Sequence, residues 1–211
     1  MIVFPIKDVA TAPLAPSQPN ATPAAPPPSP AALDLSGGWS VTFQPGGRSI
    51  TMDRLRSWTD DEATRYFSGV ATYEKEVVVP DAMVARGRTL TLDFGEGQAM
   101  APERLRSGTQ AWLDGPVREA AVVYVNDRRA GSVWCPPYSI DVTGLLTRGA
   151  NTLRILVGNL AINDMAGHPL PNYRVLNLRY GVRFEAQDMD KVQPVPAGLA
   201  GPIRLIAGSA N

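Results

Sequence analysis

The chain has 211 residues, with 20 Lys and Arg against 20 Asp and Glu, so its formal net charge is zero and its isoelectric point is about 6.6. This balance argues against the basic surface of a nucleic-acid-binding or membrane-surface protein. The single cysteine, Cys135, excludes an internal disulfide, and the chain has no apolar run of roughly 18 residues that could span a bilayer.

The first 32 residues differ in composition from the rest. Residues 11–32 are dominated by Pro, Ala and Ser, which bury too little apolar surface to offset the entropy of ordering, so we interpret them as a disordered linker. Residues 1–10 then represent the last strand of a preceding domain that this chain lacks. Recognition of a proline-rich motif by another protein is the alternative. Residues 1–10 lack the features of a signal peptide; localisation stays open, because sequence upstream could carry one.

Alternating apolar residues predict strands from residue 39 onward, since successive side chains of a strand point to opposite faces. Between the first strands, the acidic residues after Thr59 predict a short helical turn. The side chains expected to face the core are Trp39, Val41 and Phe43; Ala71, Tyr73, Lys75, Val77 and Val79; Leu90, Leu92 and Phe94; and Leu153, Ile155 and Val157.

The middle of the chain predicts a series of short strands. Residues 120–125 read as a strand, Asn126 and Asp127 as a turn, and residues 129–133 as the returning strand. Two segments, 98–118 and 160–193, have no clear period and are expected to be irregular. No helix longer than about two turns is expected, so the prediction is an all-β sandwich of antiparallel strands.

Three consecutive stretches carry a family resemblance: residues 123–131, 137–146 and 148–157. In this order and spacing they resemble the sugar-binding jelly roll of glycoside hydrolase family 2, a galactose-binding-like fold. Four further stretches resemble the C-terminal sandwich of the α-L-rhamnosidases of glycoside hydrolase family 106. They are residues 35–43, 57–69, 159–163 and 198–203.

The resemblance implies a galactose-binding-like sandwich over residues 33–207, followed by a tail at 208–211. In such enzymes a separate barrel domain carries the catalytic carboxylates, with calcium assisting, and the enzymes are usually periplasmic or secreted. The barrel is not in this chain, so no catalytic residue is carried over and the chain itself is not expected to be catalytic. The implied partners are the barrel of a parent or split hydrolase and a rhamnose-containing glycan.

Independent catalytic sites find little support in the residues. A Ser–His–Asp site would have to use His168, the only histidine, and no Gly-x-Ser-x-Gly elbow is present. Cys135 stands beside two prolines and is read as turn packing. His and Cys do not recur at zinc-ligand spacing. Pairing of distant carboxylates in a glycosidase site stays open, with solvated surface charge as the plainer interpretation.

Sugar binding needs an aromatic platform and a few convergent polar groups. The candidates, with core packing as the alternative for each aromatic residue, are Trp112, Trp134, Tyr138, Asn159, Asn163 and His168. The resemblance also implies a structural calcium ion; its candidate ligands are Asp60, Asp61 and Glu62, with surface charge as the alternative.

Three roles are therefore considered for the chain. The first is a non-catalytic module that braces a rhamnosidase-like catalytic domain and contacts glycan. The second is a freestanding lectin-like protein that binds carbohydrate without a barrel. The third is a purely structural interaction module.

Overall fold

The structure is a computed structural model that describes residues 31–209 except 102, 106–107, 111–112, 184 and 186–190. The predicted preceding strand at residues 1–10 and the predicted linker at residues 11–32 lie outside the described residues up to position 30. Ala31 and Ala32 are described, and they belong to a strand in which they pair with Ala207 and Ile206. No helix in the described part of the chain is both long and apolar enough to cross a membrane.

The described residues form sixteen strands, two short α-helices and one 3-10 turn. In chain order they are β1 (Ala31–Asp34), β2 (Trp39–Gln44), β3 (Arg48–Met52), η1 (Trp58–Asp60), β4 (Val70–Val79), β5 (Arg88–Asp93), β6 (Gln98–Ala99), β7 (Glu103–Leu105), β8 (Gly108–Gln110), β9 (Leu113–Asp114), β10 (Val117–Arg118), β11 (Ala120–Val125), β12 (Arg128–Val133), β13 (Ser139–Asp141), β14 (Gly149–Gly158), α1 (Ile162–Gly167), α2 (Arg174–Tyr180), β15 (Gly198–Leu199) and β16 (Arg204–Ser209).

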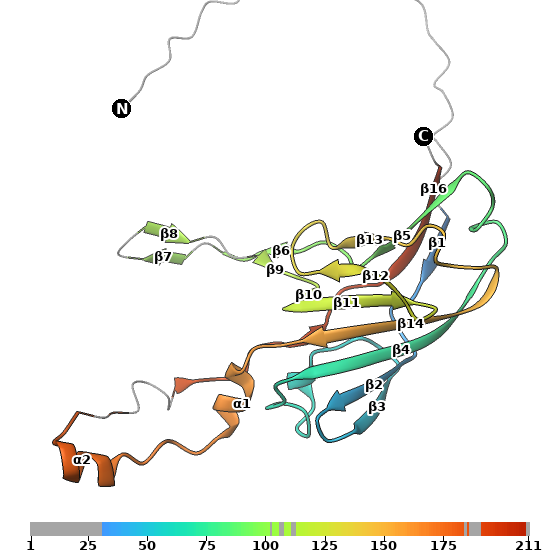
Figure 1. Cartoon of the computed structure of the whole chain (residues 1–211). Helices are drawn as coiled ribbons and strands as arrows, with labels where there is room; N and C mark the ends of the chain where they lie inside the picture. The colour runs from blue at the N-terminus through green and yellow to red at the C-terminus, as the bar shows by residue number, and fades with distance from the viewer. Residues whose placement is uncertain are drawn as a thin grey trace, which may run out of the picture.

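Two antiparallel sheets form the sandwich (Figure 1). The smaller has the strand order β1-β16-β5-β13, and the larger has the order β12-β11-β14-β4-β2-β3. The longest pairing joins β4 and β14 over ten residue pairs, from Val70 opposite Gly158 to Val79 opposite Gly149. This architecture confirms the predicted all-β sandwich class.

The strand faces follow the predicted alternation, because one face of each sheet is buried against the other sheet. Every apolar side chain expected to face the core is buried. Lys75 is the exception, since it is only partly buried: its ammonium group donates to the Gly37 carbonyl and lies 5.7 Å from the centroid of the Trp39 ring. Its apolar stem thus fills the position while its charged end reaches a polar partner.

The structure contains both of the turns that were predicted from the sequence. Asn126 and Asp127 have φ values of 49° and 62°, as the two-residue turn between β11 and β12 requires, which confirms that prediction. The helical turn near Thr59 is η1, and it begins at Trp58 rather than after Thr59. Its cap is Ser57, whose hydroxyl accepts a hydrogen bond of 3.2 Å from the Thr59 backbone N–H.

The two segments expected to be irregular are partly ordered. Between residues 98 and 118, β6 pairs with β9 and β7 pairs with β8, and these strand pairs project from the sandwich as a ribbon (Figure 1). Gln98 and Ala99 are both exposed, which explains why this segment shows no inward–outward alternation in sequence. Helices α1 and α2 lie in the second segment.

A buried polar contact joins three distant parts of the chain. The indole N–H of Trp58 donates to the Tyr73 hydroxyl at 2.6 Å, and the backbone N–H of Leu199 donates to the same oxygen at 3.4 Å. Trp58 also packs edge-on against Phe43 and Phe67, with ring centroids 5.5 and 5.4 Å away. Burial raises the pKa of Tyr73 to about 12, against the opposing effect of the hydrogen bonds from Trp58 and Leu199.

The raised pKa of Tyr73 sets an upper pH limit for the full stability of the fold. Because the pKa of Tyr73 is higher in the folded state than in the unfolded chain, its contribution to stability is complete below pH 10 and is lost as pH rises to about 12. Tyr73→Phe should remove this pH-dependent loss. At neutral pH it should also lower the free energy of unfolding by about 1–3 kcal/mol, because the Trp58 N–H loses its acceptor. Denaturant unfolding at pH 7, 9 and 11 measures both effects.

The matched control is Tyr66→Phe, because Tyr66 is exposed. It should leave both the stability at pH 7 and the alkaline loss as in the unaltered chain. Equal alkaline loss in the Tyr73 and Tyr66 variants would show that Tyr73 does not set the limit.

Candidate functional site

A cleft of about 360 Å³ opens beside Tyr138 at the junction of β5, β9 and β13. Pro136 and Pro137 end the ladder after β12, and the chain then returns into the smaller sheet. The backbone N–H of Phe94 donates to the Tyr138 carbonyl at 2.9 Å, which fixes the loop against the end of β5. The lining residues are Asp93, Gly95, Glu96, Gly97, Leu113, Pro136, Pro137, Tyr138 and Ser139.

Two glycines allow the walls of the cleft to approach closely. A Cβ atom at Gly115 would lie 2.6 Å from the Tyr138 hydroxyl oxygen, and one at Gly97 would lie 2.8 Å from Leu113. The ribbon therefore packs directly onto the Tyr138 loop. The result is an apolar wall with the carboxylates of Asp93 and Glu96 beside it, a combination suited to a ring with an apolar face and hydroxyl groups.

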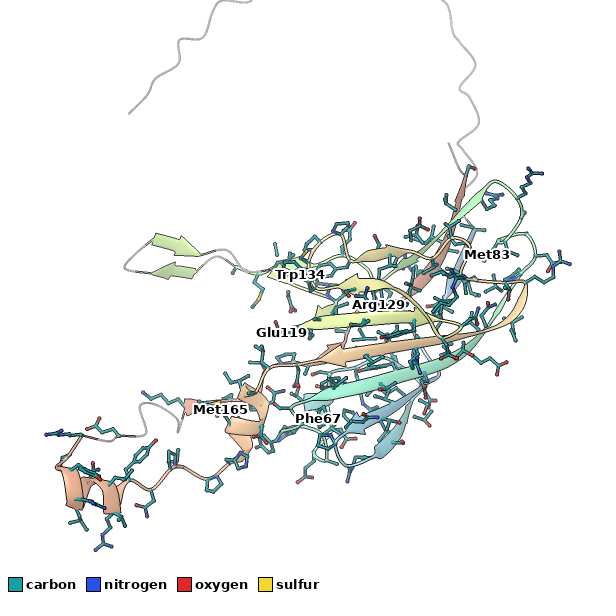
Figure 2. The ribbon with its side chains drawn as sticks, viewed as in Figure 1. Phe67, Met83, Glu119, Arg129, Trp134 and Met165 are labelled. Atoms are coloured by element: carbon teal, nitrogen blue, oxygen red, sulfur yellow. The ribbon has the colours of Figure 1, made fainter. Side chains whose placement is uncertain are left out.

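Trp134 stands near this cleft but outside its lining. Its side chain is 69% exposed, and it lies between β12 and the double proline that contributes to the cleft. Figure 2 shows Trp134 where the β6–β9 ribbon leaves the sandwich. The structure therefore places Trp134 and Tyr138 on the same loop, with Trp134 accessible and Tyr138 largely buried. Trp112 lies outside the described residues.

The other three sugar-binding candidates lie around α1 and do not line the cleft. The Asn159 side chain accepts from the Gly69 N–H at 3.0 Å and donates to the Phe67 carbonyl at 2.9 Å, so it ties the end of β14 to the start of β4. His168 is exposed, and its Nδ1 lies 2.9 Å from the Asp164 carbonyl oxygen and 3.3 Å from the Asp164 carboxylate.

Asn163 is the buried polar residue of α1. Its side chain donates to the Val195 carbonyl and accepts from the Val195 N–H, both at 2.9 Å. We call this pair of bonds the Asn163 latch. Both ends of the Asn159 amide and of the Asn163 amide engage backbone groups, so these residues have structural roles, and sugar contact by them stays a prediction.

Of the three acidic candidates for calcium, Asp61 engages protein groups. The Asp61 carboxylate accepts from the Ala63 N–H at 2.9 Å and lies 3.8 Å from the Arg56 guanidinium. Thr64 donates to the nearby Trp58 carbonyl at 2.8 Å. Within the described ranges no three His, Cys, Asp or Glu side chains gather as metal ligands do. A calcium site at Asp60, Asp61 and Glu62 stays a prediction.

One feature of the structure was not predicted from the sequence. We call residues 169–183 the α2 arm; they lead from α1 through α2 and project from the sandwich (Figure 1). No residue of α2 is buried. The signal was present in the sequence, because apolar residues three and four positions apart share a helix face. The exposed large apolar side chains of the arm are Leu170, Val175, Leu176, Leu178, Tyr180 and Val182.

No protein-family model matches the chain. A solved rhamnosidase from Novosphingobium sp. PP1Y is 28% identical over 88% of this chain, with a TM-score of 0.61, and the chain spans 16% of its length. A Formosa agariphila protein provisionally named a beta-glucuronidase is 30% identical over 143 residues, which are 65% of this chain and 11% of that protein.

A Bifidobacterium dentium beta-glucuronidase shares the fold alone. Its TM-score is 0.53 at 18% identity, with 88% of this chain and 31% of that chain covered. The chain therefore resembles a non-catalytic domain of glycoside hydrolases and spans only a small part of each of these proteins.

The Asn163 latch should control how firmly the arm is attached. Asn163→Ala should lower the free energy of unfolding by about 1–3 kcal/mol, because it leaves the partly buried Val195 N–H and carbonyl without partners. It should also speed proteolysis between residues 164 and 194, since that loop loses its closing bonds. Chemical denaturation and limited proteolysis followed by mass spectrometry measure the two effects.

His168→Ala is the matched control at the other end of the same helix, because His168 is exposed. It should change stability by less than about 0.5 kcal/mol. If both variants were cleaved at the same rate, the latch would not be what holds the arm.

Proposed function

We propose that this chain acts as the non-catalytic sandwich of an α-L-rhamnosidase-like glycoside hydrolase and braces the catalytic domain. The observation that carries this proposal is the likeness to the Novosphingobium rhamnosidase over 88% of the chain at 28% identity. Because the chain spans 16% of that enzyme, the role it fits is that of one domain among several.

A hybrid enzyme tests this role. The segment of the Novosphingobium rhamnosidase that matches this chain is replaced by the full chain, and release of rhamnose from an aryl α-L-rhamnoside is measured together with the melting temperature. The hybrid should keep activity within about tenfold of the parent, because a bracing domain supports the catalytic geometry without supplying reacting groups.

Two further versions of the enzyme serve as controls. One lacks the segment, and the other carries the sandwich of the Bifidobacterium dentium beta-glucuronidase, which has the same fold at lower identity to this chain. Both should lose activity and melt at lower temperature. A hybrid no more active than the deleted enzyme would refute the bracing role.

The exposed Trp134 favours a second candidate function, which is contact with a rhamnose-containing glycan. Trp134 is exposed two residues before Pro136, which lines a cleft together with Leu113, Asp93 and Glu96, and a sugar ring requires an aromatic platform and nearby polar groups. The freestanding lectin-like role rests on the same observation.

The isolated chain should then bind rhamnose-containing oligosaccharides, and Trp134→Ala should weaken that binding at least tenfold. The variant should melt within a degree or two of the parent, because Trp134 lies on the surface. Calorimetric titration measures the affinity, and Leu160→Ala, also at an exposed apolar residue, is the control. Equal affinities in the two variants, or no binding by the unaltered chain, would eliminate this function.

A further inference from the structure

The α2 arm exposes several large apolar side chains that a stable helix in water would bury. Val175 is 76% exposed, Leu178 is 80% exposed and Val182 is 84% exposed. Large contiguous apolar patches on a protein surface mark interaction sites. Scattered single residues would need no explanation, but here six large apolar side chains gather within one arm of fifteen residues, 169–183.

The helix also lacks the packing that stabilises short helices. It has seven residues, and helices shorter than about 12 residues are marginal in water unless an apolar face packs against something. Val175 and Leu178 share one face, and Leu176 and Tyr180 share another, yet all four are exposed. A partner that covers these faces would supply the missing stabilisation.

The base of the arm is held firmly. Asn163 precedes the arm and Val195 follows it, and the Asn163 latch joins them. The Ser68 hydroxyl donates to the Leu160 carbonyl at 2.7 Å and accepts from the Asp164 N–H at 3.1 Å. Figure 2 shows Met165 of α1 at the end of the sandwich from which the arm projects. The base of the arm is thus tied to the sandwich, which reduces the entropy lost on docking.

The charges of the arm indicate what kind of surface covers it. Arg174, Arg179 and Arg183 lie among the apolar residues, and residues 169–183 contain no Asp or Glu. The Arg179 guanidinium lies 5.3 Å from the centroid of the Tyr180 ring. A second copy of the arm would bring six arginines together, which electrostatic repulsion opposes. An apolar surface with carboxylates at its rim is complementary to the arm in both hydrophobicity and charge.

We propose that the α2 arm is the docking element of this chain, and that it inserts into an apolar groove with an acidic rim on a glycoside hydrolase catalytic domain. This inference rests on the proposed bracing function and adds the surface and the chemistry of the partner. The chain spans 16% of the related rhamnosidase, so a domain that could cover the arm exists in that enzyme beyond the matched region.

The test uses the hybrid rhamnosidase that contains the full chain. Leu178→Asp places a charge in the apolar face of the arm and should shorten the half-life of rhamnosidase activity on heating at least tenfold. Val78→Asp is the matched control. Val78 is 69% exposed on β4 and pairs with Ala150. Ala150 lies near the first residue of β14, whereas α1 follows the last residue of that strand. It should leave the half-life within twofold of the hybrid.

A second pair of variants tests the acidic rim. Arg179→Glu with Arg183→Glu should also shorten the half-life at least tenfold at low salt. Arg86→Glu with Arg88→Glu reverses the same number of charges at exposed positions before and within β5 and should have little effect. In the isolated chain every one of these variants should melt as the unaltered chain does, because all the altered side chains are exposed.

The outcomes separate the two proposals. An active hybrid that is insensitive to Leu178→Asp would retain the bracing function and overturn docking through the arm. Equal effects of the arginine pairs in the arm and near β5 would overturn the acidic rim. A dimer of the isolated chain that Leu178→Asp converts to a monomer, seen by light scattering, would assign the arm to a second copy and overturn the proposal.

Discussion

The sandwich depends on the contact between Trp58, Tyr73 and Gly198. These residues come from a loop turn, a central strand and a short strand near the C-terminal end of the fold, so no local propensity brings them together. Gly198 has a φ of 97°, and a Cβ atom there would lie 2.5 Å from the Trp58 indole nitrogen and 2.7 Å from the Tyr73 oxygen. Both the backbone angle and the space require glycine. This contact explains why glycine occupies position 198, the first residue of β15.

Much of the fold could be predicted because the strands alternate between a buried and a polar face. Trp39, Val41 and Phe43 show this period in sequence and are buried in the structure. The order of strands within the sheets could not be read in the same way, since it depends on contacts between distant residues. The family resemblance, carried by stretches such as residues 123–131, added the expectation of a galactose-binding-like jelly roll to the antiparallel sandwich that periodicity predicts.

The candidate site was less predictable than the fold. Aromatic residues at the ends of strands pointed to Trp134 and Tyr138, but sequence spacing could not show that Trp134 is accessible while Tyr138 is mostly enclosed. Asn163 was selected for its polar side chain, and the structure uses that side chain to bond the backbone of Val195. The α2 arm was missed because its apolar pairs, Val175 with Leu178 and Leu176 with Tyr180, span only two turns of a seven-residue helix, too short to establish a helical period in the sequence.

The Asn163 latch has an evolutionary consequence. It brings the two ends of a loop of about thirty residues, 164–194, together at the surface of the sandwich. Lengthening such a loop adds little closure entropy, so insertions and deletions within it leave the core almost undisturbed. Selection can therefore replace one arm with another while the sandwich stays the same. Proteins that share this sandwich can therefore differ in their binding partners while they retain the Asn163 latch.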